Sequence, residues 1–276
     1  MLENDHIDLI VSKRKLAPMK VPLHVVQARR ARLAEVVSRE GYLPVAQVCE
    51  RFGISEATAR RDLAALAKAK AITRTRGGAL VEYNQRFPSF RDRQGVGDAG
   101  KRRIARQARH LIKPGMTIWL DSGTTIFRLA ELLVDQPASD LVVVTNSLPV
   151  AEALADRVDM AVHLLGGQFF RRSSLLLAGR SLANLAEWRF DLAFLGVEGF
   201  DREGLWNSHE DIVTLQRAAC ARSVRSVVLA DSTKLGRAAP TYLGDWRQST
   251  HLITDASGRV LAQHGIALAS GQLIEA

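Results

Sequence analysis

The chain has 276 residues, of which 47% are hydrophobic and 24% charged, enough apolar material for buried cores in more than one domain. No window approaches the roughly 18 to 20 uncharged apolar residues of a membrane span, and the N-terminal region lacks the apolar core of a signal peptide. We therefore expect a soluble, cytoplasmic protein without membrane contact. The two cysteines, Cys49 and Cys220, and the scattered histidines have no ligand-like spacing, so we expect neither a disulfide framework nor a metal site.

The positive charge is unevenly distributed. Residues 1–90 hold 16 Lys and Arg against 9 Asp and Glu, a net charge of +7, whereas residues 91–276 carry only +2. A small basic domain joined to a near-neutral larger one indicates a polyanion-binding module on a body with another role. A basic surface that is only solvated would explain the same charge distribution, so a binding motif is needed to decide between the two.

Residues 1–24 precede the first regular pattern. They contain the basic cluster Lys13-Arg14-Lys15 and a second methionine, Met19. We expect an N-terminal extension that is either a mobile, disordered basic arm or a segment that translation from Met19 would leave out.

Three helices and a hairpin are predicted next. Apolar residues recur with a helical period over residues 26–40, and a second short helix over residues 45–52 is closed by Gly53. Ser55 is a candidate N-cap for a third helix, which places Ala59, Leu63 and Leu66 on one face. Residues 71–81 read as a basic β-hairpin with Gly77-Gly78 at its turn. This order is that of a winged helix-turn-helix domain.

The exposed face of the third helix has the chemistry that the major groove of DNA demands. Small side chains let a helix approach, and arginine pairs bidentately with guanine or contacts phosphate. A basic wing beside such a helix commonly contacts the backbone or minor groove. The candidate DNA-binding residues are Ser55, Ala57, Thr58, Arg60, Arg61, Lys68, Arg74 and Arg76.

Residues 83–100 have the composition of a linker, with a proline, charged residues and three glycines. Its end, GVGDAG at residues 95–100, lies 21 residues before Asp121 and imitates a dinucleotide-binding fingerprint. That fingerprint needs a buried strand before its first glycine, and the charged, proline-containing stretch before Gly95 cannot supply one. We therefore expect a flexible linker and no nucleotide cofactor.

From residue 101 on, helical and strand patterns alternate, and the strands are apolar throughout. This indicates an α/β domain with a mostly parallel sheet covered on both faces. The predicted helices span residues 101–112, 125–133, 149–156 and 213–220, and the predicted strands span residues 116–121, 141–145, 160–165, 191–197, 227–231 and 251–255.

Polar residues follow the predicted strands, where open α/β sheets bind their ligands. Gly123 allows a close backbone approach, Thr124-Thr125 would begin a helix whose N–H groups can bind an anion, and Lys234 adds a positive charge. Any one such loop is also ordinary turn composition. The candidate effector-binding residues are Asp121, Ser122, Gly123, Thr124, Thr125, Asn146, Ser147, Gly166, Gly167, Glu198 and Lys234.

Both halves of the chain resemble the DeoR family of bacterial transcriptional regulators. The first resemblance runs through Arg29, Leu33, Val37, Gly41, Phe52-Gly53-Ile54-Ser55, Thr58, Arg60-Arg61-Asp62-Leu63, Arg74 and Gly77-Gly78-Ala79. The second runs through Lys101, Asp121-x-Gly123-Thr124-Thr125, Thr145-Asn146-Ser147, Gly166-Gly167, Gly179, Asp191-x-x-Phe194-x-Gly196, Gly204 and Asp231-x-x-Lys234. The sequence departs from the family at Arg76, Gly100 and Leu205-Trp206-Asn207.

The resemblance implies an extension over residues 1–24, a DNA-binding domain over 25–82, a linker over 83–100 and an effector-binding domain over 101–276. It implies that the second domain is similar in fold to ribose-5-phosphate isomerase and binds a phosphorylated sugar or similar metabolite. We accordingly expect a regulator, a repressor of genes of sugar or related carbon metabolism, that binds double-stranded operator DNA as a dimer or tetramer.

The alternative is a sugar-phosphate isomerase with an added basic domain. Isomerisation needs a general base, for which Asp191, Glu198 and Asp231 are the candidates. The related isomerases carry an Asp-Gly-Ala-Asp stretch where this chain has Gly196-Val197-Glu198-Gly199. Because that acid pair is missing, we expect no catalytic residues and no enzyme activity.

Overall fold

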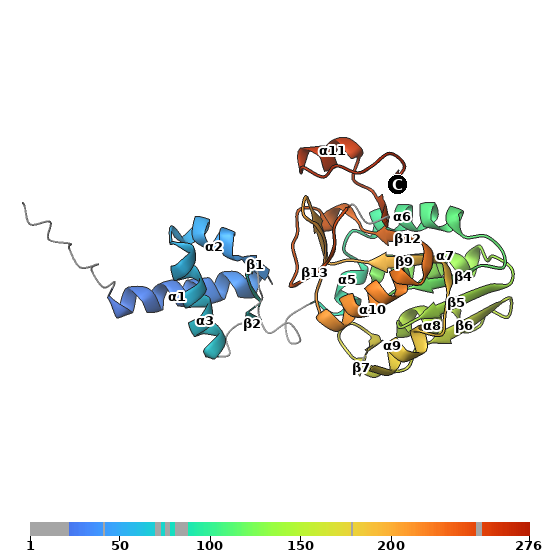
Figure 1. Cartoon of the computed structure of the whole chain (residues 1–276), viewed down its shortest axis with the longest axis horizontal. Coiled ribbons are helices and arrows are strands. Elements are labelled where there is room, and N and C mark those ends of the chain that lie inside the picture. Colours follow the sequence, from blue (N-terminus) through green and yellow to red (C-terminus); the bar gives the residue numbers. More distant parts are fainter. Residues whose placement is uncertain are drawn as a thin grey trace, which may run out of the picture.

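The computed structural model describes residues 22–40, 42–69, 73–74, 78–80, 88–177, 179–246 and 250–276. Before residue 81 these form helices α1 (Leu23–Glu40), α2 (Val45–Phe52) and α3 (Glu56–Lys68) and strands β1 (Tyr42–Pro44), β2 (Thr73–Arg74) and β3 (Gly78–Leu80) (Figure 1). Leu33, Val48 and Leu63 are buried where the three helices meet. The predicted winged helix-turn-helix is confirmed.

The turn between α2 and α3 follows from two residues. Gly53 ends α2 with a φ of 60°, a left-handed conformation that glycine adopts without steric cost. Ser55 then caps α3 by accepting a hydrogen bond from the backbone N–H of Thr58. Strand β1 was not predicted; it pairs with β3 through Leu43, which is fully buried, and extends the wing to three strands.

A buried carboxylate joins α1 to α3. Asp62 is 1% exposed and accepts hydrogen bonds from Arg29 Nε at 2.7 Å and from Arg30 Nε at 2.8 Å. Part of the excess positive charge of this half of the chain is thus used inside the fold.

The larger part of the chain is built on a seven-stranded sheet in the order β15-β14-β12-β9-β4-β5-β6, in which every neighbouring pair is parallel. Its strands are β4 (Thr117–Leu120), β5 (Leu141–Thr145), β6 (Met160–Leu164), β9 (Phe190–Gly196), β12 (Ser223–Leu229), β14 (Thr250–Thr254) and β15 (Leu273–Glu275). The predicted α/β fold with a parallel sheet is confirmed.

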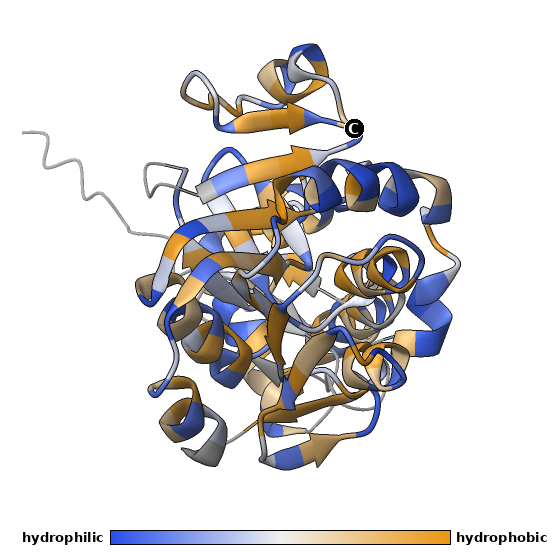
Figure 2. Cartoon of the chain, turned by 90° about the vertical axis from the view of Figure 1, so that its right-hand side faces the viewer, coloured by the Kyte–Doolittle hydropathy of each residue, from blue (hydrophilic) through white to orange (hydrophobic). Residues whose placement is uncertain are grey.

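Helices cover both faces of this sheet. Ile104 of α6 (Asp98–Leu111), Leu129 of α7 (Thr124–Asp135) and Val150 of α8 (Leu148–Leu154) belong to one buried cluster. Leu185 of α9 (Gly179–Leu185) and Leu215 of α10 (Glu210–Ala221) belong to the other, together with residues of α11 (Gly258–Gln263). The central strands are accordingly hydrophobic along most of their length (Figure 2).

Several short strands were not predicted, because three or four residues carry too little periodicity to be seen in the sequence. They are β7 (Gln168–Phe170) and β8 (Leu175–Leu177), which form a hairpin, β10 (Gly199–Asp201), β11 (Gly204–Asn207) and β13 (Thr241–Gly244), which form a small antiparallel sheet, and the edge strand β15. None of the described helices is long and apolar enough to cross a membrane.

Part of the segment expected to be a linker is helical. Helix α5 (Phe90–Gln94) begins with a capping box between Ser89 and Asp92, and α6 begins at Asp98, within GVGDAG. Phe90 is 4% exposed and packs edge-to-face on Phe127, with ring centroids 5.5 Å apart. The expectation of a flexible linker end is wrong for these residues, because composition does not reveal one buried aromatic side chain; residues 81–87 lie outside the described ones.

Replacing Asp62 by alanine should lower the stability of the helix-turn-helix domain by about 2 kcal/mol, because it leaves two partly buried guanidinium groups without their carboxylate. Glu56→Ala is the matched control, since it removes an exposed partner of Arg60 and should change stability by less than about 0.5 kcal/mol. Hydrogen exchange of the α1 and α3 amides measures both. Equal effects of the two substitutions would contradict the role given to Asp62.

Candidate functional site

The centre of the sheet contains a topological switch point. From β4 the chain continues to β5 and β6 on one side and later returns to place β9 and β12 on the other. A crevice opens at the carboxyl ends of strands at such a point. The cavity found there is lined by Arg93, Ser122, Gly123, Thr124, Thr125, Ser173, Leu175, Gly196, Val197, Glu198, Asn207, Ser208, Ile212 and Lys234.

The N-terminus of α7 forms one wall of this cavity. Gly123 takes the N-cap position with a φ of 121°, which disfavours side chains, and no side chain caps the helix. The first turn contains no acidic residue, and its N–H groups have no partner within the helix. Together with the helix dipole they form a site that favours an anion.

Two cations and one carboxylate form the opposite wall. Glu198 accepts a hydrogen bond from Arg93 at 2.9 Å and one from Lys234 at 3.0 Å, and all three side chains are about 15% exposed. Burial opposes the charged form of Glu198, but Lys234 and Arg93 outweigh it and hold the pKa of the carboxyl below its usual value. The cluster therefore carries a net charge of about +1 toward the cavity.

Lys101, in α6, contacts the backbone of Arg93, one member of this cluster. Its side chain is buried, and its ammonium donates to the backbone carbonyl of Arg93 at 2.7 Å. Burial lowers the pKa of Lys101 to about 8, with Asp231 opposing the shift. The ammonium therefore remains mostly protonated at neutral pH and fixes the end of α5.

Asp121 braces the crevice and does not line the cavity. Its Oδ2 accepts hydrogen bonds from Gly196 N at 3.1 Å and from Gln216 Nε2 at 2.6 Å, which tie the end of β4 to β9 and α10. Burial raises the pKa of Asp121 to about 6 despite these hydrogen bonds.

Four other predicted effector residues also lie outside the cavity lining. Asn146 is fully buried, and Ser147 caps α8 by accepting from Val150 N. Gly166 and Gly167 follow β6, where a Cβ on Gly167 would clash with the backbone of Leu177. Asn146 and Gly167 thus pack against β8 of the β7–β8 hairpin. The loops after β5 and β6 end one and two strands beyond β4, away from the switch point.

The structure thus brings together Ser122, Gly123, Thr124, Thr125, Glu198 and Lys234 among the predicted residues. Sequence reasoning missed Arg93, Ser173, Asn207 and Ser208. Arg93 was hidden in a segment with linker composition, and Asn207 appeared only as a departure from the family pattern. Asn207 donates to Gly196 O at 3.1 Å and so helps to hold the cavity floor.

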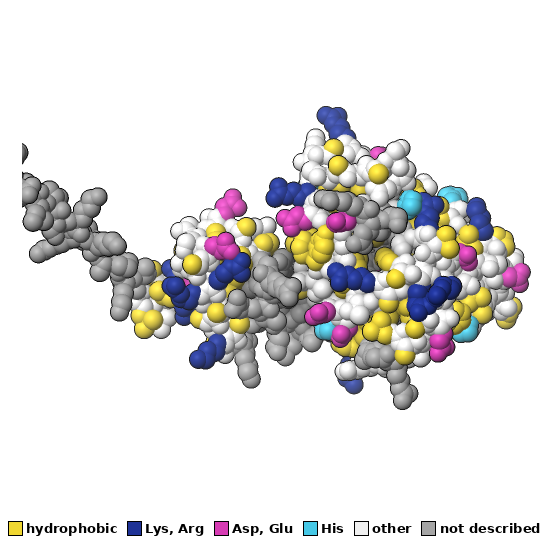
Figure 3. Space-filling model, viewed as in Figure 1, with side chains coloured by type: hydrophobic (Ala, Val, Ile, Leu, Met, Phe, Trp, Pro, Cys, Tyr) yellow, Lys and Arg dark blue, Asp and Glu magenta, His cyan; other side chains and the backbone are white. Residues whose placement is uncertain are grey.

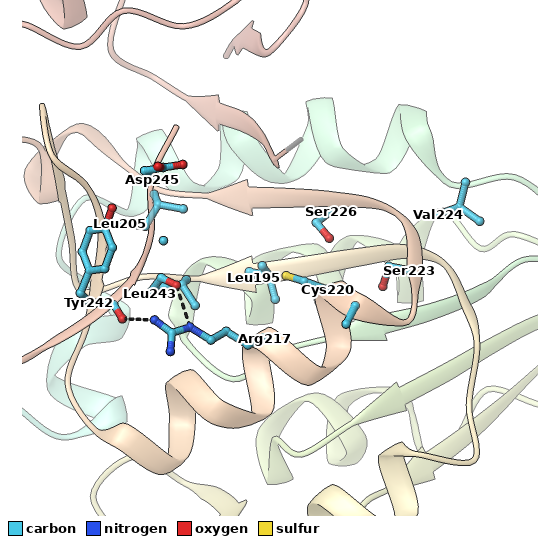
Figure 4. Close-up of a pocket in the computed structure, with 12 residues that line it drawn as sticks. Leu195, Leu205, Arg217, Cys220, Ser223, Val224, Ser226, Tyr242, Leu243 and Asp245 are labelled. Carbon is cyan, nitrogen blue, oxygen red and sulfur yellow. Dashed lines mark hydrogen bonds between the residues drawn. The ribbon is translucent and has the colours of Figure 1, made fainter. Parts of the chain in front are cut away.

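A second cavity lies between α10, β12 and β13 (Figure 4). Arg217 points into it, but its guanidinium is already bonded to the carbonyls of Tyr242 and Leu243. Cys220 and Ser226 form part of the wall. This cavity contains none of the predicted site residues.

The predicted DNA contacts lie on and around α3. Ala57, Arg60, Arg61 and Lys68 are exposed, Thr58 is half-buried, and Ser55 is the N-cap. Arg60 bonds to Glu56, whereas Arg61 has no hydrogen bond or ion pair with the described residues. Arg74 lies in β2, paired with Ala79, and Arg76 is outside the described residues. Figure 3 shows Lys and Arg side chains on this part of the chain, interspersed with acidic ones.

Comparison with known proteins decides the family. A model of the DeoR-like helix-turn-helix domain matches residues 29–85, and a model of the DeoR C-terminal sensor domain matches residues 98–256. The chain belongs to the DeoR family. The prediction of a DNA-binding transcriptional regulator is thereby confirmed.

Two relatives of this DeoR-family chain are repressors by name. It is 32% identical over 244 residues to the glycerol-3-phosphate regulon repressor of Escherichia coli K12, covering 86% of this chain and 95% of that one. It is 30% identical over 230 residues to the transcriptional repressor GlcR of Bacillus subtilis, covering 83% and 88%. Among solved structures, ribose-5-phosphate isomerase A of Methanocaldococcus jannaschii aligns with a TM-score of 0.38 and 18% identity, over 51% of this chain and 55% of that one.

The raised pKa of Asp121 predicts a pH dependence of stability. The folded state favours the protonated form of the Asp121 carboxyl. The contribution of this carboxyl to the free energy of unfolding is therefore present below about pH 4 and is lost as the pH rises through about 6. Asp121→Asn should remove this dependence, so that the wild type loses on the order of 3 kcal/mol relative to the variant between pH 4 and 7.5. Urea unfolding followed by tryptophan fluorescence reports on this domain, because all four tryptophans, Trp119, Trp188, Trp206 and Trp246, lie in it. Parallel pH profiles would contradict the assignment.

Proposed function

We propose that this protein is a repressor that binds operator DNA through α3 and the wing, and whose operator affinity is set by a small phosphorylated metabolite in the crevice. The observation that carries the proposal is the uncapped N-terminus of α7, which lines one cavity with Arg93 and Lys234. As a regulator of chromosomal DNA it acts in the cytoplasm, on genes of sugar or related carbon metabolism.

The DNA-binding surface is the exposed face of α3. Ala57 and the polar residues at the start of the helix allow close approach to the major groove, and Arg61 extends from the same face without a competing partner among the described residues. Arg60 must give up its ion pair with Glu56 before it can contact DNA. Since recognition helices read repeated half-sites, we infer a symmetric dimer or tetramer.

The chemistry of the crevice favours a phosphate monoester that also carries hydroxyl groups. The N–H groups of α7 and the two cations supply donors and positive charge for a phosphate dianion. Glu198 supplies acceptor oxygens for hydroxyl groups, and Ser122, Thr125 and Ser208 add polar groups along the lining. The name of the Escherichia coli relative, a glycerol-3-phosphate regulon repressor, fits this class of ligand.

None of the three candidate bases of the isomerase alternative, all of them described residues, is well placed for general base catalysis. Asp191 accepts a hydrogen bond from the backbone N–H of Thr117 at 2.8 Å. It lies near the amino-terminal end of β9, whereas the cavity is at the carboxyl ends of the strands. Asp231 caps the 3-10 helix Ser232–Lys234. Glu198 is paired with two cations, which lower its pKa and so weaken it as a base. These placements favour a sensor over an enzyme.

The DNA-binding proposal predicts that Arg61→Ala weakens binding to the operator by about 1–3 kcal/mol if the arginine contacts a base edge. Arg106→Ala is the control, because Arg106 is an exposed arginine of α6 outside the DNA-binding domain. Fluorescence anisotropy should be measured with the genomic fragment that the wild type selects and with a scrambled fragment, at several salt concentrations. An equal loss on both fragments would reassign Arg61 to a phosphate contact. If the wild type selects no genomic fragment at any salt concentration, operator binding is contradicted.

The effector proposal predicts that Lys234→Met lowers the affinity for a phosphate ester about tenfold or more, because a charge-assisted hydrogen bond is lost. Lys113→Met, which changes an exposed lysine far from the crevice, should leave the affinity unchanged. Calorimetry with glycerol 3-phosphate, glucose 6-phosphate and their unphosphorylated parents measures both affinities. Tighter binding of an unphosphorylated compound would contradict the ligand class, and turnover of any phosphate ester would revive the enzyme alternative.

A further inference from the structure

Helix α5 lies next to the effector cavity in space and next to the DNA-binding domain along the chain. It begins ten residues after β3, the last strand of the wing. One of its five residues, Arg93, lines the cavity and bonds to Glu198. The segment that leaves the DNA-binding domain therefore reaches the effector site directly.

The position of α5 depends on contacts with three walls of the crevice. Phe90 packs on Phe127 of α7, and its backbone N–H donates to Arg172 O, in the β7–β8 turn, at 2.7 Å. Arg93 reaches Glu198 after β9, while Lys101 of α6 holds the Arg93 carbonyl. A helix of five residues is too short to be stable by itself, so these contacts decide where it lies.

The start of this helix is also fixed by side-chain hydrogen bonds. Ser89 and Asp92 form a reciprocal capping box, in which the Ser89 N–H donates to the Asp92 carboxylate at 2.8 Å and the Asp92 N–H donates to the Ser89 hydroxyl at 3.2 Å. The capping box thus links the Asp92 side chain, next to Arg93, to the first residue before α5.

Arg93 can change partners without leaving the partly buried charge of Glu198 unpaired. A phosphate dianion at the N-terminus of α7 offers oxygens in the geometry that a guanidinium binds bidentately. If Arg93 turns to that phosphate, Glu198 keeps its 3.0 Å hydrogen bond to Lys234. A carboxylate with Arg93 as its sole partner would resist the exchange, because it would be left buried and uncompensated.

We propose that Arg93 is a phosphate ligand of the effector and the residue that couples effector binding to DNA binding, by exchanging Glu198 for the phosphate and shifting α5. This inference rests on the proposed function and deepens it. An effector acts only through a difference in its affinity for two states, and the partner exchange of Arg93 supplies that difference.

The test compares Arg93→Met with Arg91→Met, its neighbour on the same short helix, whose side chain is exposed. Inorganic phosphate and glycerol 3-phosphate serve as probes, with ionic strength held constant by chloride. Calorimetry gives probe affinity, and fluorescence anisotropy gives the ratio of operator Kd with saturating probe to that without it. For the wild type and Arg91→Met we expect a ratio that departs from 1 by about fivefold or more. For Arg93→Met we expect a ratio within twofold of 1 and about a tenfold loss of probe affinity.

Arg93→Lys guards against misfolding of the methionine variant, because it keeps the charge but loses the bidentate geometry. It should retain operator binding and show less than a third of the wild-type change in operator Kd. A full wild-type ratio in either folded Arg93 variant would overturn the coupling role while leaving the proposed function intact. A wild type whose operator Kd responds to neither probe would contradict the proposed function and this inference together.

Discussion

The sensor site depends on the pairing of the Glu198 carboxylate, partly buried, with both Arg93 and Lys234. It allows two cations to stand beside the uncapped N-terminus of α7, where without a counter-charge they would repel one another in a poorly solvated cavity. Because the carboxylate has two partners, one of them can be given up when an anion arrives. The same residue thus holds the ligand-free site together and leaves it able to respond.

The parallel sheet determines where this cluster forms. Neighbouring strands β4 and β9 direct Asp121-Ser122-Gly123 and Gly196-Val197-Glu198 to the same edge, and Asp121 bonds to Gly196 across the gap. The phosphate-favouring backbone therefore follows β4, Glu198 follows β9, and Lys234 follows β12. Helix α5 completes the wall from outside the sheet. Ligand chemistry and the connection to the DNA-binding domain consequently meet at one place.

Most of the fold could be predicted from the sequence, because the central strands are continuously apolar and the helices of the first domain carry clear caps, such as Ser55 and Gly53. Six of the 14 residues that line the cavity followed from the same reasoning, since residues such as Gly123 and Thr124 come soon after a predicted strand. The remainder depended on tertiary contacts with no local pattern: Arg93 lies in a stretch of linker composition, and its role follows from Phe90 being buried and from Glu198 lying opposite. Conversely, Asn146 and Gly167 have the composition of a ligand loop but pack the β7–β8 hairpin, because loops with similar residues serve as turns and caps.

The most direct measurement is a crystal structure of the full chain grown with and without glycerol 3-phosphate. We expect phosphate density at the backbone N–H groups of Thr124 and Thr125, with Arg93 and Lys234 within hydrogen-bond distance of its oxygens and Arg93 released from Glu198. Phosphate bound away from the α7 N-terminus would contradict the assignment of the site. Phosphate bound there with the Arg93–Glu198 pair unchanged would contradict the coupling of effector binding to helix α5.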